Sequence, residues 1–306
     1  MKKRIIFMGT PSYATTIFDK LLNDNFEIVA LFTQPDKPVG RKQVLTAPHI
    51  KQYCIDNDLT LPIFQPLKLR GNVEAQEKII NLKPDFIIVA AYGQILPREI
   101  LDIAPCINLH ASLLPLYRGA SPIQESLLND DKYTGVTSML MEEGLDTGDI
   151  LGFKYLKITS TMEVSTAFEL LSQVASDLAV STLRNYENIQ PKKQNNTKAT
   201  LCKKIKKEHG VVDFENAKKV YLKYKAYSFW PGVFLKSGLK LKDISLCEKE
   251  SINQLGEILA IGSDFVIVGC NKGSLKIKFL QAPSKKSVNA GDYIRGQRLN
   301  IKDLLS

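Results

Sequence analysis

Two polar side chains stand at the end of a short apolar segment in the middle of the chain. Residues 106–110 read Cys-Ile-Asn-Leu-His, and alternation along a β-strand points Asn108 and His110 to one face while Leu109 points into the core. A buried strand does not normally end on polar groups of these types. Downstream, residues 144–149 form a tight acidic turn bounded by glycine, which could bring Asp146 beside the histidine.

Such a trio suits the transfer of an acyl group to an amine. Histidine titrates in the range needed to take the proton of the attacking amine and to return one to the leaving nitrogen. The uncharged amide of Asn108 can donate to the oxyanion that develops. Asp146, accepting from the imidazole, would fix its tautomer. No Ser or Cys nucleophile is obviously placed beside them, so direct transfer between two bound substrates is the simpler mechanism.

Each of these residues also has an ordinary structural interpretation. A lone histidine is usually a hydrogen-bonded structural residue. An aspartate in a glycine-rich turn usually bonds its own backbone. Only their occurrence together raises the catalytic interpretation to the level of the structural one.

The elements that must position these residues follow from hydrophobic periodicity. Near-continuous apolar runs predict parallel strands at residues 4–8, 27–33, 86–90 and 106–110. Helical patterns lie between them at residues 13–22, 48–57, 73–82 and 97–103. Two more strands, 135–141 and 150–158, precede an amphipathic helix that begins near residue 164. The alternation predicts an α/β fold with a doubly wound, Rossmann-like sheet, which binds ligands beyond the carboxyl ends of its strands.

A polar segment divides the chain into two domains. We expect a catalytic domain over residues 1–188, a linker rich in Gln, Asn, Thr and Lys over 189–207, and a second domain over 208–306. Short strand-like runs between Gly, Ser, Asn and Asp turns predict a small, OB-like β-barrel there. The net charge of +9 is the sum of −4 before residue 189 and +13 from it onward. This asymmetry favours a polyanionic partner over a merely lysine-rich surface.

Several functional classes are disfavoured. The five cysteines are widely spaced and lack a C-x-x-C, so we expect neither disulfides nor a metal site. Residues 9–14 contain one glycine where a dinucleotide fingerprint has three, and no G-x-x-x-x-G-K-[ST] occurs. The longest near-apolar run, residues 86–92, is too short to cross a bilayer, and the N-terminal segment lacks a signal-peptide core. We expect a cytoplasmic protein that does not bind a membrane.

Several motifs together resemble the signature of folate-dependent formyltransferases. The residues that carry this resemblance are 108–115, 117–123 and 145–149. A fuller match, to the members that act on a charged tRNA, adds residues 7–11, 32–41, 64–66, 90–97 and 230–232. The similarity is strong over about residues 4–155 and thinner in the last third. It departs from the pattern at Lys42-Gln43-Val44, where relatives continue with glycine and lysines, and at Ser228-Phe229, where Asn-Pro is common.

The resemblance implies a reaction and a set of site residues. The formyl group of 10-formyltetrahydrofolate would pass to the α-amino group of methionine on initiator methionyl-tRNA, by direct attack through a tetrahedral intermediate. Asn108, His110 and Asp146 match the catalytic trio of the family. Folate contacts are implied for two stretches, Ser112, Leu113, Leu114 and Pro115, and Gln94, Ile95 and Leu96. Without the resemblance, the second stretch reads as an ordinary strand-to-helix loop.

The sequence also bears on the partners of the protein and on two alternative functions. Arg41 and Lys42 match a basic loop that reaches the tRNA acceptor end, with a solvated turn as the alternative interpretation. We expect a monomer. A sugar-nucleotide N-formyltransferase shares the trio, but a small nucleotide sugar does not require a surface of net charge +13. A non-catalytic tRNA-binding protein would leave the intact trio without an explanation.

Overall fold

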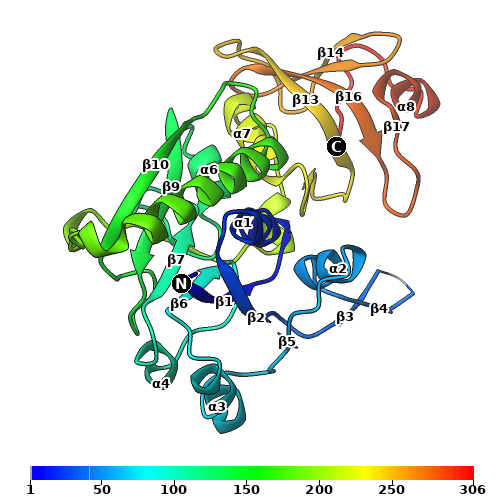
Figure 1. The fold of residues 1–306 in the computed structure, drawn as a ribbon. Helices are drawn as coiled ribbons and strands as arrows, with labels where there is room; N and C mark the ends of the chain where they lie inside the picture. The colour runs from blue at the N-terminus through cyan, green and yellow to red at the C-terminus, as the bar shows by residue number, and fades with distance from the viewer. Residues whose placement is uncertain (1, 41) are drawn as a thin grey trace. The chain divides into compact units, whose positions relative to one another are not determined.

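The chain folds into two compact units (Figure 1). The computed structural model describes residues 2–40 and 42–306. The first unit comprises the described residues up to 122 together with 133–157 and 168–202, and the second comprises 123–132, 158–167 and 203–306. Within the described ranges, no helix has the length and apolarity needed to span a bilayer.

The first unit is built on a seven-stranded mixed sheet with the strand order β10-β9-β7-β6-β1-β2-β5. Five strands are parallel: β1 (Arg4–Gly9), β2 (Glu27–Phe32), β5 (Ile63–Phe64), β6 (Phe86–Ala90) and β7 (Cys106–His110). The last two, β9 (Tyr133–Leu140) and β10 (Ile150–Lys157), run antiparallel to their neighbours. All five residues of β6 are buried, as expected for a strand covered on both faces. The doubly wound α/β class is confirmed.

Helices connect and follow the strands, close to the predicted positions except for α5, which was not predicted. They are α1 (Ser12–Asn23), α2 (His49–Asp56), α3 (Val73–Asn81), α4 (Arg98–Leu101), α5 (Pro122–Leu128) and α6 (Val164–Asn185). α3 begins where the side chain of Asn72 accepts a hydrogen bond from the amide of Ala75 at 3.0 Å, a standard N-cap. Because β1, β6 and β7 each lead into a loop at the same edge of the sheet, this edge brings together segments that are distant in sequence.

Two short strand pairs were not foreseen in the sequence. The predicted loop after β2 holds a hairpin of β3 (Lys37–Val39) and β4 (Val44–Thr46). A second pair joins β8 (Arg118–Gly119) in parallel to β11 (Leu201–Cys202). Strands of two or three residues are too short to show a hydrophobic period, which explains why the pattern missed them.

The second unit contains a six-stranded antiparallel sheet. Its path is β12 (Val233–Phe234), β13 (Lys240–Glu248), β16 (Ser274–Gln281), β15 (Val266–Gly269) and β14 (Ile258–Ile261), and β17 (Val288–Asn289) also pairs with β16. Two helices, α7 (Ala217–Tyr227) and α8 (Ala290–Gly296), contact this sheet. Its apolar core includes Leu241, Ile258, Leu275 and Ile277. The expected β domain, residues 208–306, lies within this unit, which also takes in residues 123–132, 158–167 and 203–207.

Candidate active site

The predicted trio converges at the carboxyl-terminal edge of the parallel strands. Asn108 and His110 are the third and fifth residues of β7, which lies between β6 and β9. Asp146 comes from the loop between β9 and β10. Along β7 only Asn108 is half-buried, and the other four residues, His110 among them, are buried. The three side chains therefore meet at the edge where doubly wound sheets bind their ligands.

His110 is a buried imidazole with a defined orientation. Only 6% of the residue is exposed. Its Nε2 lies 2.9 Å from the backbone oxygen of Tyr117, and because a carbonyl can only accept, Nε2 carries the proton. Its Nδ1 faces the Oδ2 atom of Asp146 at 3.7 Å. From the sequence we expected Asp146 to fix the tautomer; in the structure the carbonyl of Tyr117 makes the bond that fixes it.

Asp146 has a bonded carboxylate and lies in a tightly packed turn. Oδ2 accepts from the amide of Gly119 at 2.7 Å, and Oδ1 lies 3.4 Å from Nδ2 of Asn108. The residue has φ = 51°, in the left-handed region that aspartate tolerates better than most residues. At Gly148 a Cβ atom would lie 1.8 Å from the carbonyl oxygen of Leu140. The close packing of this turn on the end of β9 therefore requires glycine there.

The geometry of the trio determines which atoms can accept a proton and which can donate to an oxyanion. In the Nε2-H tautomer, the Nδ1 lone pair of His110 is the site that can accept a proton, and the Asp146 carboxylate is placed to stabilise the resulting imidazolium. The amide nitrogen of Asn108 has two hydrogens, of which one points toward Asp146 and the other can serve an oxyanion. The thiol nearest in sequence, Cys106, is buried, and burial raises its pKa to about 12, which disfavours the thiolate that a nucleophile requires.

The loop after β7 is rigidly built. Ser112 is fully buried, and its hydroxyl donates to the carbonyl of Leu116 at 2.6 Å. Thr137 Oγ1 donates to the Ser112 carbonyl at 2.7 Å and accepts from the amide of Leu114 at 3.0 Å. The peptide bond between Leu114 and Pro115 is cis. Because the Ser112 hydroxyl is already used inside the loop, this stretch offers a ligand mainly backbone and apolar surface, including half-buried Leu113.

In the stretch after β6, residues 94–96, two of the three side chains are bonded or buried within the protein. Gln94 accepts from the amide of Leu69 at 3.0 Å and donates to the carbonyl of Pro66 at 2.8 Å. Leu96 is buried, whereas Ile95 is 68% exposed. Only Ile95 among the three presents a free apolar side chain at this edge of the sheet.

Of the two predicted tRNA-contacting residues, Lys42 is exposed in the turn between β3 and β4. Arg41 lies outside the described residues. Across residues 2–40 and 42–306, no group of three or more His, Cys, Asp and Glu side chains could hold a metal ion.

Sequence reasoning missed three groups that hold the trio. They are the carbonyl of Tyr117, the amide of Gly119, and the side chain of Gln194, whose Nε2 donates to the backbone oxygens of Asp146 and Gly148 at 2.9 and 2.7 Å. Two of them are backbone atoms, which no residue type reveals. The third comes from a segment interpreted as an exposed linker because of its polar composition.

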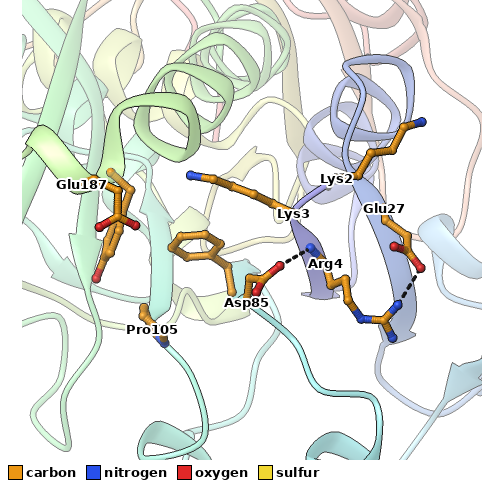
Figure 2. Close-up of a pocket in the computed structure, with 9 residues that line it drawn as sticks. Lys2, Lys3, Arg4, Glu27, Asp85, Pro105 and Glu187 are labelled. Carbon is orange, nitrogen blue, oxygen red and sulfur yellow. Dashed lines mark hydrogen bonds and ion pairs between the residues drawn. The ribbon is translucent and has the colours of Figure 1, made fainter.

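A pocket of about 830 Å³ lies at the opposite, amino-terminal edge of the sheet (Figure 2). Residues at or just before the first positions of β1, β2, β6 and β7 line it. Among its charged side chains, Arg4 Nη1 forms an ion pair with Glu27 Oε1 at 2.7 Å. The backbone amide of Arg4 also donates to the carboxylate of Asp85 at 2.7 Å. None of the trio contributes to its lining, so we exclude it as the place of a reaction carried out by His110.

Comparisons with known proteins agree along the whole chain. Two family models match, one described as formyl transferase over residues 2–183 and one as formyl transferase, C-terminal domain, over 204–298. The methionyl-tRNA formyltransferase of Nitratiruptor sp. is 55% identical over 98% of this chain and 99% of its own length. The enzyme of the same name from Sulfurimonas denitrificans is 53% identical over 99% of this chain and 100% of its own.

Solved structures extend the likeness at the level of the fold. An N-formyltransferase from Helicobacter canadensis, in complex with folinic acid and dTDP-3-aminofucose, covers 92% of this chain and 100% of its own with a TM-score of 0.69 at 17% identity. HypX from Aquifex aeolicus, in complex with tetrahydrofolic acid, covers 96% of this chain and 47% of its own with a TM-score of 0.67 at 17% identity. Because relatives above 50% identity match almost end to end, this chain belongs to the formyltransferase family, among the methionyl-tRNA formyltransferases.

Proposed function

We propose that this protein transfers the formyl group of 10-formyltetrahydrofolate to the α-amino group of methionine on initiator methionyl-tRNA, for the start of translation. The observation that carries this proposal is the 55% identity to a methionyl-tRNA formyltransferase over 98% of the chain. Family membership makes the protein a formyl-transferring enzyme whose donor is a formylated tetrahydrofolate.

The trio provides what the reaction needs. The donor supplies an acyl carbon bonded to a nitrogen that can leave. The Nδ1 atom of His110 takes a proton from the attacking amine as the new carbon–nitrogen bond forms, and Asp146 stabilises the imidazolium across 3.7 Å. The free N–H of Asn108 donates to the oxyanion. His110 then returns the proton to the leaving nitrogen as the old carbon–nitrogen bond breaks.

The chain also fits the donor. The rigid 112–115 loop and exposed Ile95 stand at the same sheet edge as the trio and offer the apolar, backbone-lined surface that a flat heterocycle requires. We therefore assign the folate contacts to Ser112, Leu113, Leu114, Pro115, Gln94, Ile95 and Leu96. Gln94 and Ser112 act by shaping their loops, because their side chains bond within the protein.

For the tRNA we assign two contact regions. One comprises Arg41 and Lys42, of which Lys42 lies in the turn between β3 and β4. The other is the basic second unit, in which the lysines of the 203–207 stretch, and Lys285 and Lys286, are exposed. Exposed lysines neutralise backbone phosphates without reading sequence. We further infer that the enzyme acts as a cytoplasmic monomer away from membranes, where charged tRNA and folate are both available.

A side-by-side acceptor assay tests the proposal. Purified protein and 10-formyltetrahydrofolate are offered charged initiator tRNA, charged elongator methionyl-tRNA and an amino sugar nucleotide. We expect formyl transfer to the initiator tRNA, much less to the elongator and none to the sugar. Transfer to the sugar with none to either tRNA would establish instead a sugar-nucleotide N-formyltransferase.

A further inference from the structure

The segment between the catalytic trio and the second unit is attached to the site at several points. Residues 194–202 belong to the first unit. Gln194 is half-buried and bonds three residues: its Nε2 donates to the backbone oxygens of Asp146 and Gly148, and its Oε1 accepts from Arg118. One side chain thus joins the aspartate loop to the loop that follows β7.

Arg118 anchors that side chain. The residue is 6% exposed, and its guanidinium donates to Gln194 Oε1 from Nε at 3.0 Å and from Nη2 at 2.7 Å. Nη2 also donates to Asn196 Oδ1 at 2.8 Å. These three bonds hold the buried guanidinium, and through it Gln194, in a fixed position.

The same segment also fixes the backbone groups that touch His110 and Asp146. Thr200 Oγ1 accepts from the amide of Tyr117 at 2.8 Å, and the Thr200 carbonyl accepts from the amide of Arg118 at 2.9 Å. A Cβ atom on Gly119 would lie 2.2 Å from the carbonyl oxygen of Cys202. β11 therefore sets the position of the Tyr117 carbonyl, which holds His110, and of the Gly119 amide, which holds Asp146.

We infer that Gln194, clamped by Arg118, is a positioning residue that holds Asp146 in line with His110. This inference rests on the proposed function, because it assigns Asp146 a catalytic role. Asp146 sits in a left-handed conformation directly after four exposed residues, 142–145, and Gln194 supplies the side-chain donor to its backbone oxygen. Without that donor the carboxylate loses its alignment with His110. The loss should appear in kcat and not in the KM of either substrate.

Gln194→Glu tests this directly, because it keeps an acceptor for Arg118 and removes the donor to Asp146. We expect kcat to fall roughly ten- to a hundredfold, with both KM values within about threefold, as for groups that act only in the transition state. Gln190→Glu is the matched control: Gln190 is exposed in the preceding stretch, and the same charge change there should leave kcat unchanged. Gln194→Met repeats the test without a new charge if the glutamate variant does not fold.

A double variant separates positioning from general support. In an Asp146→Asn background, Gln194→Glu should lower kcat by much less than in the wild-type background, because both changes act through one carboxylate. If the fold-loss of kcat in the double variant equals the product of the two single-variant losses, the inference is wrong. A Gln194→Met enzyme with wild-type kcat would also overturn it.

Hydrogen exchange of the Gly119 amide provides a readout without turnover. That amide bonds the Asp146 carboxylate at 2.7 Å, so its exchange should accelerate in Gln194→Glu and stay unchanged in Gln190→Glu. If the wild-type enzyme does not transfer the formyl group, the proposed function is wrong. If the exchange rate of the Gly119 amide is unchanged in both Gln194 variants, only the positioning role is wrong.

Discussion

The two units place their polar groups in opposite ways. In the first, the site groups are shielded and engaged: His110 is 6% exposed, and the Asp146 side chain is 12% exposed and bonded to Gly119. In the second, most lysines stand free in solvent, and Lys225 is a buried exception near Asp130, with its pKa lowered mainly by desolvation. Shielded groups with fixed partners are suited to stabilise a transition state, and solvated lysines to attract a polyanion.

This contrast predicts two kinds of variant. Changes at the catalytic edge should lower kcat, and changes among the surface lysines should raise the KM for tRNA.

His110→Ala and Asn108→Ala should have the largest effect. We expect each to lower kcat by roughly two to four orders of magnitude, the usual scale for a general base or an oxyanion donor. Turnover by a purified, folded variant at saturating substrates measures this. Near-full activity of either variant would remove its residue from the mechanism.

Asp146→Asn should have a smaller effect. The amide keeps the shape and can still accept from Gly119, but it cannot stabilise an imidazolium. Because Asp146 lies 3.7 Å from Nδ1 and makes no hydrogen bond to the ring, we expect a loss of about ten- to a hundredfold, below the roughly ten-thousandfold loss of a directly bonded triad aspartate. A kcat equal to that of wild type would contradict this assignment.

Replacing Lys203, Lys204, Lys206 and Lys207 together by alanine should act on tRNA affinity. All four are exposed in the second unit. If each neutralises one phosphate, the log–log slope of affinity against salt should flatten by up to about 3 to 4. The same change at Lys285 and Lys286 should flatten it by up to about 2. If a folded variant keeps its tRNA affinity, the lysines replaced in that variant do not contact tRNA phosphates.

Arg41→Ala should act more modestly and on the same quantity. We expect weaker tRNA use, with the affinity for the folate donor unchanged, because Lys42 next to it lies in an exposed hairpin turn. Lys42→Ala is the companion variant. Equal losses in folate and tRNA affinity would place this turn at the donor site instead.

Lys2→Ala and Glu187→Ala should have almost no effect. Both residues line the pocket at the amino-terminal edge (Figure 2), and both are exposed. We expect kcat and both KM values to stay within about twofold of wild type, because substitutions of exposed residues away from a functional site usually have small effects. A selective loss of activity here would reopen that pocket as a ligand site.

The fold and the trio could be predicted from particular residues, and the support around the trio could not. Alternation along residues 106–110 placed Asn108 and His110 on one face, and the apolar run before them showed that they end a core strand. Gln194 gave no such signal, because a glutamine in a polar stretch has the composition of a solvated linker. The carbonyl of Tyr117 and the amide of Gly119 are backbone atoms, whose use depends on tertiary contacts alone.

The division of labour between the two units has one most direct test. Single-turnover formyl transfer is measured across a range of tRNA concentrations for wild type, His110→Ala and the fourfold 203–207 lysine variant. We predict that only His110→Ala lowers the rate at saturating tRNA, by about a hundredfold or more, and that only the lysine variant raises the tRNA concentration at half saturation. A full saturating rate in His110→Ala, or a loss in the lysine variant confined to that rate, would contradict the account.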